Sequence, residues 1–119
     1  MKLAAQIATA LVAVLHLYFL VLEMFLWERP FGRRTFGLTP EFAAASKSLA
    51  ANQGLYNGFL AAGLLWGLWL GDAGTAVKLF FLGCVVVAGA FGAVTVNRKI
   101  LAVQALPGAI ALVLVWLSA

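Results

Sequence analysis

Four long apolar segments constrain the fold of this chain more than any other feature. They cover about residues 3–27, 48–70, 76–96 and 100–117, and each is long enough to cross a bilayer as a helix. The chain is 65% hydrophobic and only 10% charged, and its mean hydropathy is +1.05. A soluble domain of this length needs more polar residues to cover its surface. We therefore expect an all-α integral membrane protein, in which residues 1–119 form one bundle of four transmembrane helices.

The connections between these segments predict the orientation of the bundle. The first, residues 28–47, is a longer polar loop, in which Thr39-Pro40-Glu41 is typical of a helix start and predicts a short helix over Glu41–Ser46. The other two connections are short turns. Loops one and three carry six basic residues, whereas the termini and loop two carry two. The positive-inside rule thus predicts a cell (inner) membrane protein with loops one and three in the cytoplasm and both termini outside.

The basic residues also indicate which partners the chain has. The net charge is +4, but the charges lie at the ends of apolar segments rather than on one solvated face, which argues against nucleic acid. In the first loop Arg29, Arg33 and Arg34 alternate with Phe31 and Phe36. This pattern fits a loop in the headgroup region whose arginines meet membrane lipids, or a plain charged loop that only sets the topology.

Several kinds of site are excluded by the residues present. One histidine, one cysteine and one deep carboxylate are too few for a closed transition-metal site within one chain. The sequence has no set of residues typical of a catalytic triad, and its glycines follow helix-packing intervals rather than a phosphate-binding loop. We therefore expect neither a metal nor a cofactor.

Polar residues inside the apolar segments predict a site. In hydrocarbon an unpaired amide costs a few kcal/mol, so Asn52, Gln53 and Asn57 of the second segment need protein or water as partners. Glu23 of the first segment and Gln104 of the fourth lie at a similar depth, about 6–8 Å from the cytoplasmic ends of their helices. These residues predict a polar pocket that opens to the cytoplasm and is closed on the outer side.

Each candidate has a functional and a structural interpretation. Glu23 and His16, seven residues apart on one helical face, are candidates for proton transfer, but Glu23 can also pair with a nearby basic residue and His16 can be a neutral core residue. The amides are candidates for ligand binding or for contacts that lock helices together. The same choice, between ligand binding and packing, applies to Tyr56 and Trp27.

Four motifs in the chain resemble a known family. They are H16-L-Y-F-x-x-x-E23-M-F-x-W27, F36-G-L-T-P-E-F42, N52-Q-G-L-Y-N-G-F-L-A-A-G-L64 and Q104-A-L-P107. Together they resemble the small bacterial membrane proteins of domain of unknown function 1304, over nearly the whole chain. The resemblance implies a four-helix integral membrane protein and carries no established activity.

Three functions fit these residues. The first is a site for a lipophilic small molecule, with possible isomerase-like proton chemistry similar in kind to that of four-helix membrane sterol isomerases. The second is a proton-coupled exporter, because one acid in the first of four helices is similar to the small multidrug resistance family. The third is a structural or accessory subunit whose amides lock helices. Rows of small residues, such as Gly54/Gly58, serve packing within one chain or in a homodimer. Whether the protein is an enzyme stays open.

Overall fold

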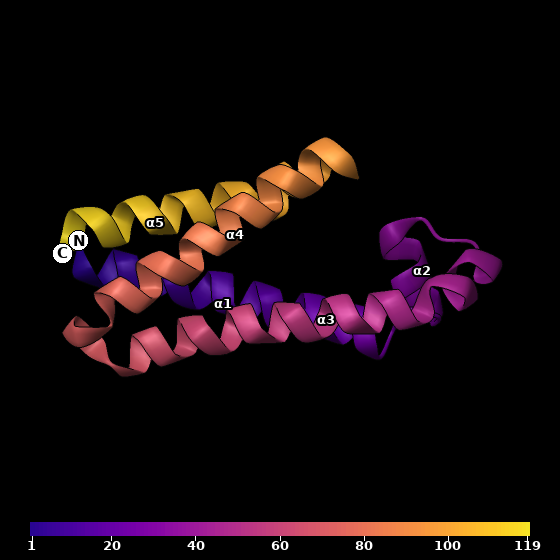
Figure 1. Cartoon of the computed structure of the whole chain (residues 1–119), viewed down its shortest axis with the longest axis horizontal. Helices are drawn as coiled ribbons and strands as arrows, with labels where there is room; N and C mark the ends of the chain where they lie inside the picture. Colours follow the sequence, from indigo (N-terminus) through magenta and orange to yellow (C-terminus); the bar gives the residue numbers. More distant parts are fainter. The chain divides into compact units, whose positions relative to one another are not determined.

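The computed structural model describes residues 1–119, which form helices and no strands (Figure 1). The elements in chain order are α1 (Lys2–Met24), α2 (Pro30–Phe36), α3 (Pro40–Trp69), the 3-10 turn η1 (Gly71–Gly74), α4 (Thr75–Thr95), the π-helical turn η2 (Leu101–Ala105) and α5 (Leu106–Ser118). The prediction of an all-α fold is confirmed.

Three helical stretches are long and apolar enough to cross a membrane. They are Lys2–Met24, Gly71–Thr95 and Leu101–Ser118. α3 is longer, with 30 residues, but it is not among them. Its carboxamides at Asn52, Gln53 and Asn57 and its polar first turns lower its hydropathy. The structure therefore supports a membrane protein, whereas a crossing by α3 does not follow from its composition.

The first connection is more ordered than a loop. Pro30 begins the short helix α2, because the fixed φ of proline suits the first helical position and Arg29 before it is extended, with φ −75° and ψ 155°. Gly37 ends α2 in the left-handed conformation, with φ 66°, and its N–H donates to the carbonyl of Arg33. The sequence predicted a polar loop at these residues and did not predict this helix.

α3 begins within the same connection. The Thr39 hydroxyl accepts a hydrogen bond from the backbone N–H of Phe42 at 3.1 Å, as expected for an N-cap. The predicted short helix over Glu41–Ser46 does not end at Ser46, however, because α3 continues without a break to Trp69. The residues that follow Ser46, KSLAA, contain no proline or glycine that would stop a helix.

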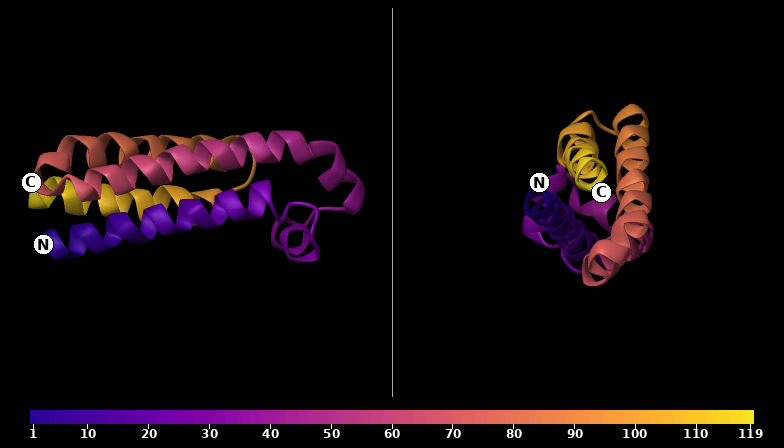
Figure 2. Two further views of the ribbon diagram at one scale, coloured as in Figure 1. Left: turned by 90° about the horizontal axis from the view of Figure 1, so that it is seen from below. Right: turned by 90° about the vertical axis from the view of Figure 1, so that its left-hand side faces the viewer.

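The chain packs as two compact units. Unit 1 contains Met1–Val14 and Leu60–Ala119, and unit 2 contains Leu15–Phe59. Unit 1 has a hydrophobic core of buried side chains from α1, α3, α4 and α5: Ala5, Val12, Ala13, Leu64, Leu82, Val85, Ala111 and Val115. The two chain ends lie at the same end of unit 1 (Figure 2), where Lys2 and Asp72 form an exposed ion pair at 3.4 Å.

Small residues let α4 and α5 of unit 1 pack closely side by side (Figure 1). A Cβ atom at Gly89 would lie 2.5 Å from the backbone nitrogen of Ala105, and one at Gly108 would lie 2.7 Å from Cγ1 of Val85. Neither position has room for a larger side chain. The approach of α4 to η2 therefore depends on Gly89, and its approach to α5 depends on Gly108.

The start of the last apolar stretch is wound as a π-helix rather than an α-helix. The N–H of Leu106 donates to the carbonyl of Leu101, five residues earlier. Pro107 follows at once, and it has no N–H to donate to the residue four positions earlier. The wider turn η2 therefore lies where Pro107 cannot complete an α-helical hydrogen bond.

Gly89→Ala tests the contact between α4 and the π-helical turn η2. We expect it to lower the free energy of unfolding by about 1–3 kcal/mol, because the new methyl group meets backbone atoms of Ala105 that have no room to move. The matched control is Gly83→Ala, whose Cβ atom would have no neighbour within 4 Å. Denaturant titration of both variants in detergent measures the difference, and an equal loss in the control would contradict the packing argument.

Candidate functional site

Glu23 and Asn57 form a hydrogen-bonded pair between two helices of unit 2. The Asn57 side-chain amide on α3 donates to Oε1 of Glu23 on α1 at 2.5 Å. Asn57 is buried, with only 6% of its surface exposed, and Glu23 is half-buried. Two residues that the sequence nominated on different segments are thus brought into direct contact.

Two glycines of α3 bring the pair together. A Cβ atom at Gly54 would lie 2.6 Å from Cγ of Met24 and 3.2 Å from Cβ of Glu23. One at Gly58, a helical turn later, would lie 2.8 Å from Cδ1 of Leu20. The missing side chains allow the backbone of α3 to approach α1, so the short side chain of Asn57 reaches the carboxylate.

Asn57 occupies a core position of α3. Five of the buried residues of this helix recur at intervals of three and four, which is the spacing of one helical face: Ala50, Gly54, Asn57, Ala61 and Leu64. An amide at such a position is costly without a partner. Its bond to Glu23 therefore satisfies a polar group that faces the interior of the protein.

Asn52 and Tyr56 lie on the opposite side of α3. Both are exposed, and Gln53 is exposed as well. Gly54 lies against the last two residues of α1, so Asn52 and Gln53, which precede it, are level with the end of that helix. The structure thus separates these two amides from the Glu23–Asn57 contact. The ring of Tyr56 lies 5.9 Å from that of Phe59.

His16 is completely buried in unit 2. Its ring packs edge-on against Phe19, with the ring centroids 5.4 Å apart. It shares α1 with Glu23, but seven residues of helix separate them by about 10 Å along the axis. A proton could not pass directly between the two side chains over that distance.

Trp27 joins the turn after α1 to the first half of α3. Its indole N–H donates to the hydroxyl of Ser46 at 3.0 Å, and Ser46 donates to the carbonyl of Phe42 at 2.7 Å. The Trp27 ring also lies 5.0 Å from that of Phe36 in α2. These contacts give Trp27 a structural role in unit 2.

The remaining nominated residue, Gln104, lies in unit 1. It is half-buried in the π-helical turn η2, just before Pro107. Its local position is therefore set by the irregular start of the last helical stretch.

Lys78 was not expected in the interior. Only 7% of the surface of Lys78 is exposed. Its side chain packs against Gly67 of α3, where a Cβ atom would lie only 2.6 Å from Cγ of Lys78. From the sequence it counts only as one of the two basic residues on the side of the termini and loop two. Its spacing from Leu82 and Val85, at four and seven residues, was the signal that it shares their buried face.

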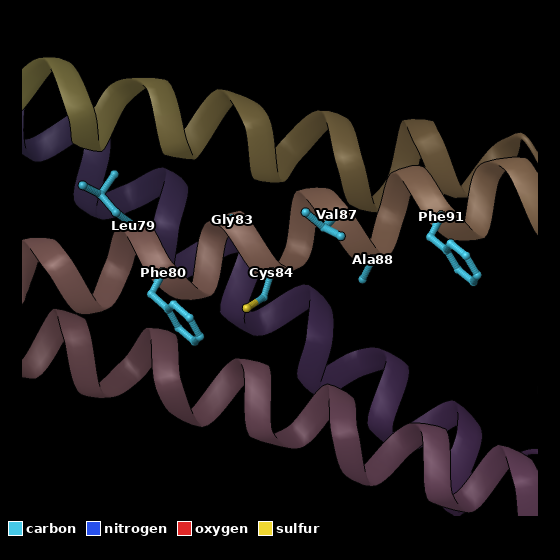
Figure 3. Close-up of a pocket in the computed structure, with 7 residues that line it drawn as sticks. All are labelled: Leu79, Phe80, Gly83, Cys84, Val87, Ala88 and Phe91. Carbon is cyan, nitrogen blue, oxygen red and sulfur yellow. The ribbon is translucent and has the colours of Figure 1, made fainter.

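A shallow groove of about 730 Å³ runs along α4 (Figure 3). All seven of its lining residues belong to this one helix, as the close-up shows: Leu79, Phe80, Gly83, Cys84, Val87, Ala88 and Phe91. None of them was a candidate site residue. On a membrane-spanning helix, an open apolar surface of this kind suits contact with lipid chains. No group of three or more His, Cys, Asp or Glu side chains suited to a metal ion is present.

Comparisons with known proteins give one family. The model of DUF1304, a protein of unknown function, matches residues 10–116. The uncharacterized protein YpaA of Lactococcus lactis subsp. lactis is 28% identical over 106 residues, which cover 87% of this chain and 89% of the relative. No solved structure matches the chain.

Asn57→Ala tests the interhelical hydrogen bond. We expect it to lower the free energy of unfolding by about 1–3 kcal/mol, because it leaves a carboxylate oxygen of Glu23 without its donor in an apolar environment. Asn52→Ala, which removes an exposed amide from the same helix, should change it by less than about 0.5 kcal/mol. Thermal unfolding of both variants in one detergent compares the two, and equal effects would mean that the pair adds nothing to stability.

Proposed function

We propose that this chain, which belongs to the DUF1304 family of unknown function, is a four-span membrane protein with an intramembrane polar site for a lipophilic small molecule. The observation that carries the proposal is the Glu23–Asn57 pair. A carboxyl group beside a buried amide, on helices otherwise suited to lipid, can hold the polar head of a molecule whose body is apolar.

The proposed topology has four crossings, made by α1, the apolar part of α3, α4, and η2 with α5. Loops one and three would lie in the cytoplasm and both termini outside the inner membrane. Six basic residues in those two loops, against two on the other side, support this orientation. The position of both chain ends at one end of unit 1 is also what an even number of crossings requires (Figure 2).

In this proposal the polar residues have different roles. The second carboxylate oxygen of Glu23 receives the polar group of the ligand, while Asn57 orients the carboxylate. Glu23 is then the residue that exchanges a proton with the ligand, and His16, which lies about 10 Å away along α1, contacts the ligand rather than Glu23. Asn52, Gln53, Tyr56 and Trp27, all in unit 2, belong to the cytoplasmic entrance. An isomerase-like reaction, in which a proton is added at one atom and removed at another, is the chemistry that one buried acid can supply.

The same contact also favours a second function. A bond between a buried amide and a carboxylate on adjacent helices is what a purely structural subunit uses to fix the register of its helices. In that case Glu23 needs only to accept a hydrogen bond. The protein would then function by forming a homodimer or a larger assembly rather than by binding a ligand.

Glu23→Gln distinguishes the two functions, because glutamine keeps an oxygen that accepts from Asn57 but loses the charge and the exchangeable proton. The matched control is Glu41→Gln, an exposed carboxylate in the first turn of α3. We expect a lipophilic compound to co-purify with the parent and the control in mild detergent and to fall at least about tenfold in Glu23→Gln, since a hydrogen bond to a charged group contributes 1.5 kcal/mol or more. Mass spectrometry of the extracted small molecules measures this.

Two outcomes of that experiment are informative. A compound lost only from Glu23→Gln, at unchanged thermal stability, identifies the chemical class of the ligand. The same bulk lipids in all three proteins would contradict the ligand site and leave the structural function as the better account.

A further inference from the structure

We propose that the segment between α1 and α3 is a docking surface for the headgroups of anionic phospholipids. The surface consists of Arg29, Phe31, Arg33, Arg34 and Phe36, all in unit 2, and we call it the α2 surface. The inference is independent of the proposed small-molecule site, because none of these residues contributes to that site.

The α2 surface is held in a fixed position. Gly32, at the centre of α2, is buried against the backbone carbonyl of Leu26, and a Cβ atom there would overlap that carbonyl. On one flank of the helix, the ring of Phe36 lies 5.0 Å from that of Trp27, which is itself bonded to Ser46. The short helix therefore rests directly on the turn that follows α1, and it cannot rotate freely.

This attachment determines which side of α2 faces outward. Residues in a helix are about 100° apart, so Arg34 lies on the side opposite the buried Gly32. Arg29, Phe31 and Arg34 are exposed, and 47% of the surface of Phe31 is accessible. The outward side thus combines guanidinium groups with an aromatic ring.

No arginine of this surface forms an ion pair in the protein. The nearby Glu28 accepts an ion pair from Lys47 at 3.2 Å, and Glu23 is bonded to Asn57. Neither of the ion pairs in the structure involves an arginine. The Nε atom of Arg33 is buried and has no hydrogen-bond partner. Three cations thus lie together on one short segment with their charge uncompensated.

The place of this segment in the chain indicates phospholipid as the occupant. Arg29 follows the end of α1, a helix long and apolar enough to span a membrane, by only five residues. Phe25, between them, is 66% exposed. One guanidinium group can donate two parallel hydrogen bonds to the oxygens of a phosphate. Exposed aromatic rings are favoured at the boundary between headgroups and acyl chains. A surface of anionic phospholipid supplies both kinds of partner at that level.

The test uses Trp27 as a local reporter. The full chain with Trp66, Trp69 and Trp116 replaced by phenylalanine keeps Trp27 as its single tryptophan, and those three rings are exposed in the parent. This protein is reconstituted into vesicles of phosphatidylcholine that contain either brominated phosphatidylglycerol or brominated phosphatidylcholine. The ratio of the two quenching constants gives the preference of the α2 surface for the anionic lipid.

Each arginine should contribute a factor of about five to the preference for the anionic lipid, which is the contribution of one basic residue at an anionic membrane surface. We therefore expect a preference on the order of a hundredfold at Trp27 if the contributions of the three arginines multiply. Arg34→Gln, which changes an exposed side chain, should lower the ratio by about fivefold. Arg33→Gln/Arg34→Gln should bring it down to about fivefold, the contribution that Arg29 alone still makes. In every variant, quenching by the neutral lipid should stay the same, which shows that the depth of Trp27 has not changed.

The matched control is Arg98→Gln/Lys99→Gln, which removes two exposed basic residues from the turn between α4 and η2. It should leave the ratio at Trp27 unchanged, because those charges belong to another part of the chain. A ratio near one in the parent would overturn the proposal. So would a ratio that Arg34→Gln and the double substitution leave intact, or one that the control lowers equally.

Discussion

The cost of an unpaired polar group among apolar helices is the constraint on which the rest of this structure depends. The chain buries an amide, Asn57, on a helix face made otherwise of small and aliphatic residues. That amide is tolerable only because Glu23 on α1 accepts its hydrogen bond. The orientation of two helices in unit 2 is therefore tied to one polar contact, and this contact is also the best candidate for chemistry.

Close approach of helix backbones makes that contact possible, and glycine provides it in both units. In unit 2, Gly54 and Gly58 let α3 approach α1, and in unit 1, Gly89 and Gly108 let α4 approach η2 and α5, respectively. In lipid, burial of apolar surface no longer drives helices together, so van der Waals contact between closely packed backbones gains in importance. The glycines that stabilise the packing thus also set the distance between the helices, and with it the length of side chain that can form a contact between them.

The two proposals concern different surfaces and different physics. The intramembrane site depends on a partly desolvated carboxyl group, where one hydrogen bond has a large effect on what can bind. The α2 surface depends instead on charge that the protein does not compensate, at a level where water and headgroups are present. A membrane protein with both would bind its surrounding lipid at one surface and a particular lipophilic molecule at the other.

The sequence by itself determined the helical fold, the apolar segments and the basic character of the first connection, because each follows from residue composition over many positions. The sequence nominated Glu23 and Asn57, but only as two of six polar candidates inside the apolar segments. Asn52 and Asn57 are five residues apart, so they point to different sides of α3, and only packing decides which of them faces α1. The positions of Gly54 and Gly58 decide it in favour of Asn57. The burial of Lys78 was also decided by tertiary structure, since it depends on the room that Gly67 of α3 leaves beside it. The helix α2 and the uninterrupted course of α3 follow instead from local residues: Pro30 and Gly37 bound α2, and no helix-stopping residue follows Ser46.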